Sequence, residues 1–288
     1  VKIFVGTQSN GQGHETVYAQ FLSDQTGIPT EKIIVVQGDS DLIPRGGGTG
    51  GSRSVTVQNN ATLATVEKFI QSFSQYLSEK LEVEVEDIGF DDTSFRIKGS
   101  NYSPNVLEVA KMACEDLRFD LLKHSAKATL DARSFPNGAH FAEVEVDPET
   151  GFVQVVKYCV VDDFGNLINP MLAEGQVHGG VAQGIGQALY ENVVYDQEGQ
   201  LLTATFMDYG MPRAQDLPYY KFETECVPST ANIMGMKGCG EAGTVGALAA
   251  VANAVQDALW GFGIQQVDMP FTSEKIWSMI NSGKLAAE

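Results

Sequence analysis

The sequence predicts an α+β fold, with mixed sheets layered with helices in two subdomains. Apolar residues recur at helical spacing in several long segments, whereas other segments alternate apolar and polar residues as half-exposed strands do. The two kinds of segment follow one another without a strict strand–helix–strand period, which is typical of this fold class. The chain has 288 residues, 43% of them hydrophobic, so it can bury one large or two medium cores.

The first half of the chain is expected to contain strands and helices in alternation. In order, we predict a strand, a helix, a strand, a long helix, two or three short strands and a helix, over residues 1–5, 14–26, 32–38, 55–80, 81–99 and 103–123. One side of the long helix carries Leu63, Val66, Phe69, Ile70, Phe73 and Leu77. The last of these helices is expected to begin with Ser103 as its cap and Pro104 in its first turn.

An irregular stretch, 124–140, separates the two halves of the chain. It contains Pro136 and Gly138, so we place the boundary there and expect subdomains 1–135 and 136–288. The second half is then expected to form a hairpin, a helix rich in small residues, a second hairpin and a long, nearly uncharged helix, over residues 140–165, 169–191, 192–210 and 244–260.

The charge balance excludes some classes of partner. Lys plus Arg is 19 and Asp plus Glu is 37, which gives a net charge of −18. Nucleic-acid binding over a broad basic surface needs clustered positive charge, and so does binding to an anionic membrane surface. The acidic balance of this chain argues against both. No apolar run approaches the roughly 18 residues of a membrane span. We therefore expect a small-molecule substrate, with no nucleic acid and no membrane span.

The cysteines and histidines argue against a metal site built from protein ligands. Four cysteines lie far apart with no C-x-x-C, which disfavours an iron–sulfur cluster or structural zinc in this chain. Their low density disfavours a disulfide framework and fits a reducing compartment, so we expect a cytoplasmic protein. The chain begins inside a predicted strand, and we expect it to be a fragment, a processed chain or one piece of a split protein.

Glycine is the informative excess, with 30 residues, and it marks four segments. In the first, Gly11-Gln12-Gly13 stands between a strand and a helix, where glycines allow close backbone approach and helix N–H groups face an anion. An ordinary tight turn explains this motif alone equally well, and the dinucleotide pattern G-x-G-x-x-G is not completed. In the second, 46–54, Arg53 with Ser52 and Ser54 could bind phosphate. A flexible surface loop is the alternative.

The third and fourth segments add polar side chains among glycines. In 179–188, the small residues permit close helix packing, while the amides of Gln183 and Gln187 are the functional candidates, since a buried amide needs partners. In 237–243, Glu241 stands alone among glycines before the last long helix. The helix N-terminus favours the ionised carboxylate of Glu241, whereas burial favours the protonated carboxylic acid. A general base is suited by this competition, because it can hold the pKa of the group near neutral pH. A capping carboxylate is the alternative.

Together and in this order, the motifs identify a resemblance. The chain resembles the C-terminal part of the molybdenum-binding subunit of the xanthine dehydrogenase, aldehyde oxidase and aerobic carbon monoxide dehydrogenase family. The matching stretches are GQGHETVYAQ, GTGGSRS, the run from AEVEVDPETG to GQALYE, LLTATFMDYGMPRAQDLP and KGCGEAGTVGALAAVANAV, at 11–20, 48–54, 142–191, 201–218 and 237–255. They span nearly the whole chain.

The resemblance implies a molybdenum–molybdopterin cofactor, in its cytosine dinucleotide form. Both subdomains would bind it, and the second would carry the catalytic glutamate. The implied cofactor contacts are Gly11, Gln12, Gly13, Thr49, Gly51, Ser52, Arg53, Ser54, Gln183, Gln187, Lys237, Gly238 and Gly240. Glu241 matches the family's catalytic base, which would deprotonate a molybdenum-bound hydroxyl. The metal is held by the pterin, so no protein ligand for it is expected.

The resemblance also implies a reaction and an assembly. Such enzymes hydroxylate a carbon centre with water-derived oxygen, and the sequence around Gln183 looks more like the branches acting on aldehydes and N-heterocycles. A complete molybdenum subunit is much longer. We therefore expect a hetero-oligomer with the N-terminal half of that subunit and with chains carrying iron–sulfur clusters and FAD. The alternative is a non-catalytic cofactor-binding or assembly fragment of such a complex.

Overall fold

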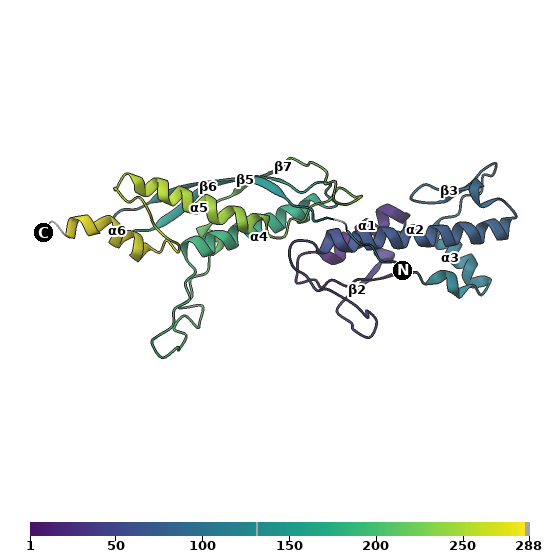
Figure 1. The fold of residues 1–288 in the computed structure, drawn as a ribbon, viewed down its shortest axis with the longest axis horizontal. Coiled ribbons are helices and arrows are strands. Elements are labelled where there is room, and N and C mark those ends of the chain that lie inside the picture. The colour runs from purple at the N-terminus through teal and green to yellow at the C-terminus, as the bar shows by residue number, and fades with distance from the viewer. Residues whose placement is uncertain (131, 286–288) are drawn as a thin grey trace. The chain divides into compact units, whose positions relative to one another are not determined.

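The computed structural model describes residues 1–130 and 132–285. The chain divides into two compact units (Figure 1). Unit 1 contains Val1–Ser134 and Pro228–Gly238, and unit 2 contains Phe135–Val227 and Cys239–Glu288. Helices and small mixed sheets make up both units, so the predicted α+β class is confirmed. The segment Pro228–Gly238 was placed with the second subdomain by sequence, whereas in the structure it belongs to unit 1.

Unit 1 is built from two short sheets and three helices. In chain order its elements are β1 (Lys2–Phe4), α1 (His14–Thr26), β2 (Ile34–Val36), α2 (Ser54–Leu81), β3 (Ile88–Phe90), β4 (Phe95–Ile97) and α3 (Val106–Glu115). Strands β1 and β2 pair in parallel, as a strand–helix–strand unit around α1 requires. Strands β3 and β4 form an antiparallel pair. The core joins α2 to these elements through side chains such as Val66, Phe73 and Leu77, which lie on the predicted apolar side.

Helix α3 begins later than the sequence predicted. Asn105, rather than Ser103, is its cap: the Asn105 side chain accepts from the Glu108 backbone N–H at 3.0 Å, and the Glu108 carboxylate accepts from the Asn105 N–H at 2.8 Å. This reciprocal pair is a capping box. The Ser103 hydroxyl instead accepts a hydrogen bond from Arg96 at 2.6 Å. The cap prediction was wrong because two possible capping residues stood two positions apart.

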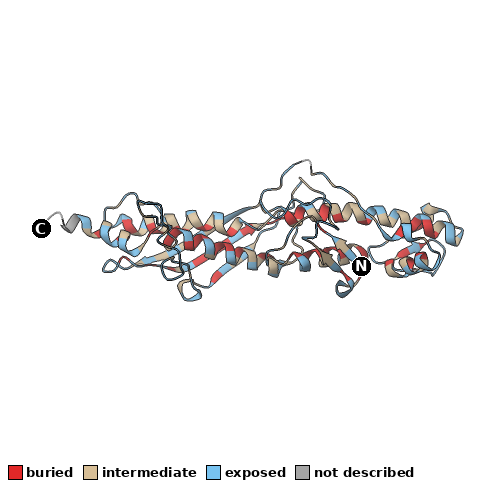
Figure 2. Cartoon of the chain, turned by 90° about the horizontal axis from the view of Figure 1, so that it is seen from below, coloured by how far each residue is buried: buried red, intermediate tan, exposed pale blue. Residues whose placement is uncertain are grey.

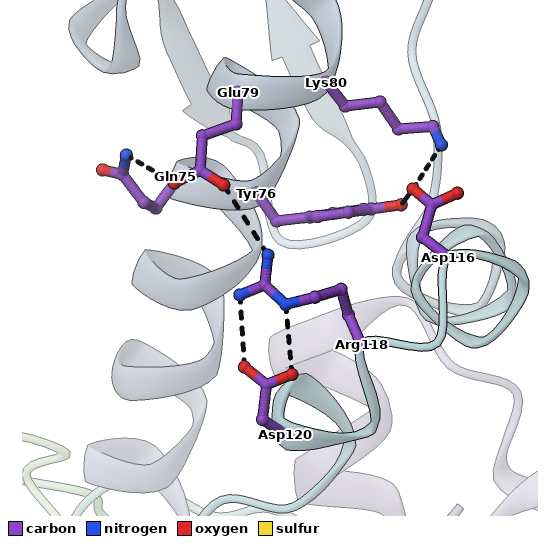
Figure 3. Close-up of polar contacts among 7 residues, drawn as sticks. All are labelled: Gln75, Tyr76, Glu79, Lys80, Asp116, Arg118 and Asp120. Atoms are coloured by element: carbon purple, nitrogen blue, oxygen red, sulfur yellow. Dashed lines mark hydrogen bonds and ion pairs between the residues drawn. The ribbon is translucent and has the colours of Figure 1, made fainter.

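A surface network joins the end of α2 to α3 and the turn that follows it (Figure 3). Tyr76 donates to Asp116 at 2.6 Å, and Lys80 forms an ion pair with the same carboxylate oxygen. Arg118 holds Asp120 with two parallel hydrogen bonds of 3.1 and 3.2 Å. The Lys80 and Tyr76 hydrogen bonds lower the pKa of Asp116 below its ordinary value.

Unit 2 is a three-stranded sheet with packed helices. Its elements are β5 (Asn137–Val146), β6 (Val153–Asp163), α4 (Pro170–Leu189), β7 (Tyr220–Thr224), α5 (Ala242–Trp260) and α6 (Ser273–Leu285). The strand order is β5-β6-β7, antiparallel and then parallel, so this sheet is mixed. Helices α4 and α5 pack on each other, and α5 also contacts β5. One apolar core joins these elements. The buried residues, red in Figure 2, alternate along the helices with exposed ones in pale blue.

The first predicted hairpin and the two long helices of unit 2 are confirmed, but the second predicted hairpin is wrong. In 192–210 the pairing is limited to one isolated bridge, between Tyr195 and Leu201, around a turn. Several apolar side chains of this segment stay exposed, including Phe206 and Met207, so no core layer holds it as a sheet. Strand β7 and helix α6 were not predicted. Within the described residues, no helix is long and apolar enough to cross a membrane.

Candidate functional site

Three loops of unit 1 meet at the N-termini of α1 and α2. We call residues 6–13, 45–54 and 232–238 the loop cluster. The Gly47 N–H donates to the Gly6 carbonyl at 2.9 Å. A Cβ on Gly46 would lie 2.7 Å from the same carbonyl oxygen, so only glycine fits there. The first two glycine motifs of the sequence therefore belong to one structural feature.

Thr49 ties these two loops together. Its hydroxyl donates to the Gln8 carbonyl at 2.5 Å and accepts from the Gln8 N–H at 3.3 Å. Ser54, the first residue of α2, donates its hydroxyl to Thr49 Oγ1 at 3.2 Å. Gln8 was not singled out by sequence, since nothing local marks a residue whose backbone pairs with a distant hydroxyl.

The third loop packs closely on the second. A Cβ on Gly238 would lie 1.5 Å from the Ser52 carbonyl oxygen. Ser52 itself has φ of 52°, a left-handed conformation that non-glycine residues adopt rarely and at a cost of about 1–3 kcal/mol. Asn232 shapes the third loop, because its side chain both donates to and accepts from the Met236 backbone, at 2.8 and 3.1 Å. Backbone strain of this kind is typical of ligand-binding loops.

Both helices that start in the loop cluster lack a side-chain cap. The cap residues are Gly13 for α1 and Arg53 for α2, and among the described residues neither makes a side-chain cap hydrogen bond. Gly13 has φ of 79°, which glycine adopts readily. Without a capping side chain, first-turn N–H groups can donate to an anion. Arg53 is exposed and adds a positive charge at the second of these helix ends.

Two buried polar side chains lie near the starts of the same helices, His14 in the first turn of α1 and Asn59 in the second turn of α2. His14 is 4% exposed and Asn59 is fully buried. Within the part of the chain that the structure describes, His14 Nδ1 and both polar atoms of the Asn59 side chain have no hydrogen-bond partner. Burial lowers the pKa of His14, and the nearby Glu15 charge opposes this. Buried polar atoms of this kind call for a ligand or ordered water.

In unit 2, glycines set the distance between α4 and α5. A Cβ on Gly243 would lie 2.4 Å from the Val177 carbonyl oxygen, and one on Gly184 would lie 2.6 Å from the Ala247 Cβ. Of the glycines in the third motif, Gly180 and Gly184 therefore serve close packing of α4 on α5, the structural alternative recognised in the sequence.

Gln183 and Gln187 lie one turn apart on α4, and both are exposed rather than buried as expected. The Gln183 side-chain oxygen accepts from the Thr244 hydroxyl at 3.2 Å, and the same hydroxyl lies 3.1 Å from the Gly180 carbonyl oxygen. Thr244 lies in the first turn of α5, and its contact with the amide oxygen leaves the Gln183 NH₂ group available as a donor.

Glu241 occupies the N-cap position of α5, directly after Gly240. Its side chain makes no cap hydrogen bond, so the capping alternative is not what this structure shows. The Glu241 carbonyl accepts from the Val245 N–H at 3.1 Å, which makes its backbone part of the first turn. The side chain is exposed, whereas the sequence argument assumed burial.

The neighbouring thiol is not a candidate ligand. Cys239 packs against the apolar core of unit 2. Burial, with a smaller contribution from the Asp162 charge, raises the pKa of the Cys239 thiol to about 11. It is therefore protonated at neutral pH, and metal ligation requires the thiolate.

The predicted site residues thus fall into two groups. Those in unit 1 are Gly11, Gln12, Gly13, Thr49, Gly51, Ser52, Arg53, Ser54, Lys237 and Gly238, and those in unit 2 are Gln183, Gln187, Gly240 and Glu241. Gln8, Asn232 and Thr244 join them through the contacts above. A hint for Thr244 was available, because it follows the Glu241 motif within one turn.

Comparison with known proteins gives consistent matches. The model of the molybdopterin cofactor-binding domain family matches residues 1–218. The chain is 38% identical to the nicotine 6-hydroxylase large subunit of Paenarthrobacter nicotinovorans, over 96% of this chain and 35% of the relative. It is 33% identical to the carbon monoxide dehydrogenase large chain of Afipia carboxidovorans, over 96% and 34%. A crystal structure of a Cu,Mo-CO dehydrogenase matches with a TM-score of 0.88 and 32% identity, over 98% of this chain and 36% of that chain.

The chain therefore spans about a third of the length of the curated relatives that it matches. The family model covers well over half of the chain, and its match includes the first three glycine motifs. On this evidence the chain belongs to the molybdopterin cofactor-binding domain family.

Proposed function

We propose that this chain binds part of a molybdenum–molybdopterin cofactor and contributes the catalytic base of a molybdenum hydroxylase. The loop cluster carries this proposal. It brings together close-packed glycines, the hydroxyl side chains of Thr49, Ser52 and Ser54, the exposed guanidinium of Arg53 and two helix N-termini without side-chain caps. That combination suits a phosphate-bearing ligand that must approach the backbone closely.

The residues present fit such a cofactor. Gly238 leaves no room for a Cβ against Ser52, and the left-handed backbone of Ser52 shapes the loop directly before Arg53 and α2. His14 Nδ1 and the Asn59 side chain, which have no hydrogen-bond partner among residues 1–130 and 132–285, add hydrogen-bonding capacity in the same two helices. When bound, the cofactor supplies the redox centre that takes two electrons from the substrate carbon.

Within unit 1, each residue has a binding role. Arg53, Thr49, Gly51, Ser52 and Ser54 would hold the phosphates of the dinucleotide end, which we take to be cytosine dinucleotide. The guanidinium would pair with phosphate oxygens, and the serine and threonine hydroxyls would donate to them. Gly11, Gln12, Gly13, Lys237 and Gly238 would contact the pterin end through backbone N–H groups and the two polar side chains.

Within unit 2, Gln183 and Gln187 would donate hydrogen bonds to the pterin from their exposed amides. The Thr244 contact supports this for Gln183, because it engages the amide oxygen and leaves the NH₂ group as donor. The Glu241 carboxylate would accept the proton of a water-derived oxygen nucleophile. Its exposed position at the start of α5, directly after Gly240, supports a role toward a substrate.

The substrate class and the assembly are part of the proposal. The relative named nicotine 6-hydroxylase supports an N-heterocycle, and an aldehyde is the second class. Since the chain spans about a third of such relatives, we propose that the N-terminal half of the subunit and chains with iron–sulfur clusters and FAD complete a cytoplasmic hetero-oligomer.

The deciding experiment is metal and pterin analysis of the purified chain, made alone and with its neighbours. Molybdenum and nucleotide are measured per protein, and acid hydrolysis identifies the nucleotide. We expect stoichiometric molybdenum and CMP only in the co-expressed assembly, because the loop cluster and the unit 2 residues supply only part of the contacts. Molybdenum at full stoichiometry in the isolated chain would refute the partial site. An assembly with cofactor but unaffected by loss of Glu241 would support a non-catalytic binding role.

A further inference from the structure

A buried polar cluster lies between the sheet and α5 of unit 2. His140 on β5 has Nδ1 2.7 Å from the Tyr158 hydroxyl and Nε2 3.2 Å from Asp162 Oδ1, both on β6. Because a carboxylate accepts only, Nε2 donates to Asp162, while Nδ1 pairs with the Tyr158 hydroxyl, which can both donate and accept. Asp162 and Tyr158 are almost fully buried. Both ring nitrogens are thus engaged, which fixes the plane of the imidazole.

Two glycines make room for this cluster. A Cβ on Gly138 would lie 1.9 Å from Asp162 Oδ1, and a Cβ on Gly246 would lie 2.5 Å from three atoms of the His140 ring. The backbone of α5 therefore rests directly on the imidazole. No side chain intervenes, so a movement of the ring must move the helix or open a gap.

The contact lies in the same part of α5 as Glu241. The carbonyl of Glu241 accepts from the Val245 N–H, so its backbone belongs to the turn that ends at Val245, the residue next to Gly246. On its other side, this turn packs through Gly243 on the Val177 carbonyl of α4. The start of α5 is thus held between α4 and the His140 ring.

We propose that His140, oriented by Asp162 and Tyr158, is a positioning residue that fixes the first turns of α5 and thereby the place of Glu241. The inference rests on the proposed role of Glu241 as base. A polar cluster suits this task better than an aliphatic contact, because two directional hydrogen bonds select one ring orientation, whereas apolar side chains tolerate several. Catalytic groups must be held to within about 0.5 Å, and supporting residues achieve this.

A double-mutant cycle tests the proposal in the assembled complex, with Gly246→Ala, His140→Ala and the double variant. The added methyl should displace the ring and the lost ring should leave a gap, so each single change should loosen the start of α5. In the double variant the methyl occupies the space that the ring leaves. Gly175→Ala on α4 is the matched control, since a Cβ there meets nothing within 4 Å.

The first readout is hydrogen exchange of amides 242–247, measured before cofactor loading. We expect each single change to speed it about tenfold, with the double variant returning toward wild type, since contacting residues couple. The second readout is turnover per bound molybdenum. We expect it to fall in each single variant and to recover in the double variant, while the KM for substrate changes less than about twofold. A purely structural loss would instead speed exchange throughout unit 2.

Two outcomes would overturn the positioning role: single effects that simply add in the double variant, or unchanged exchange in His140→Ala. If a single variant does not fold, recovery of folding in the double supports the contact, and failure of the double overturns it. Normal turnover in Glu241→Gln would reject the proposed base, whatever the exchange data show, so the two failures are distinguishable.

Discussion

Gly238 and Ser52 are distant in sequence, yet a side-chain carbon on Gly238 would come within 1.5 Å of the Ser52 carbonyl oxygen. The loop that begins at Asn232 therefore buttresses the left-handed residue that precedes Arg53 and α2. This contact fixes part of the loop cluster without using any side chain at position 238.

Gly238→Ala should accordingly displace the loop that carries Ser52 and reduce cofactor retention. The clash is with backbone, which cannot rotate away as a side-chain tip can. We expect the dissociation constant of the cofactor to rise about tenfold, which corresponds to about 1.4 kcal/mol of binding free energy, so that molybdenum per protein in the purified assembly falls. Gly47→Ala is the control, because a Cβ there meets nothing within 4 Å and should leave the metal content unchanged. Equal metal content in both variants would remove the loop cluster from cofactor binding.

Arg53→Ala should weaken retention of the dinucleotide more than it alters chemistry. A guanidinium binds phosphate with two hydrogen bonds, and Arg53 is exposed at the uncapped start of α2. The measurement is nucleotide released on acid hydrolysis per protein, alongside turnover per remaining molybdenum. Arg45→Ala, in the same loop and also exposed, is the control. Nucleotide content equal to wild type would make Arg53 a solvated surface residue.

Strong periodicity made the helices predictable from sequence. The predicted helix 14–26 coincides with α1, and 55–80 falls within one residue of α2 at each end. For α1, glycines stand at both ends with positive φ, and the chain cannot continue as a helix past them without cost. For α2, Val66, Phe73 and Leu77 all lie in the core as their spacing predicted.

Features that depend on distant contacts were not predictable in the same way. Strand β7 pairs in parallel with β6, and its alternation of apolar and polar residues, YKFET, extends over only five positions, too few to stand out in the sequence. The approach of Gly238 to Ser52 brings the loop before Cys239 into unit 1, and no local signal encodes it. His140 and Asp162 are likewise brought together by strand register, which pairs His140 with Val160 and Gly138 with Asp162. Residue types and spacing identified the candidate site, while its supporting contacts required coordinates.

Acid should reveal the contribution of Asp116 to stability. The hydrogen bond from Lys80 and, to a smaller extent, the one from Tyr76 lower the pKa of Asp116 in the folded chain below its ordinary value of 3.8. A group with a depressed folded pKa contributes stability above its unfolded pKa and loses it as pH falls through the folded one. The melting temperature of the wild type should therefore exceed that of Asp116→Asn at pH 6, and the difference should shrink toward pH 2. In a Lys80→Met background, most of this pH dependence should disappear. A melting-temperature difference between wild type and Asp116→Asn that stays the same at all pH values would contradict the prediction.

Glu241→Gln should nearly abolish turnover in the assembled enzyme while leaving cofactor content close to wild type. Glutamine keeps the shape of the side chain and its hydrogen-bonding capacity, but it cannot accept a proton from a water-derived nucleophile. Loss of a general base commonly costs about 10²–10⁴ in rate.

A role as a helix cap predicts a different result: replacing a cap would cost about 1 kcal/mol of stability and leave activity unchanged. Because the Glu241 side chain makes no cap hydrogen bond to α5, we expect the melting temperature to stay within a few degrees of wild type. Both quantities are measured on one preparation, with the rate of substrate oxidation divided by bound molybdenum. A variant retaining more than about a tenth of the normal rate, against the loss expected for a base, would take Glu241 out of the catalytic role.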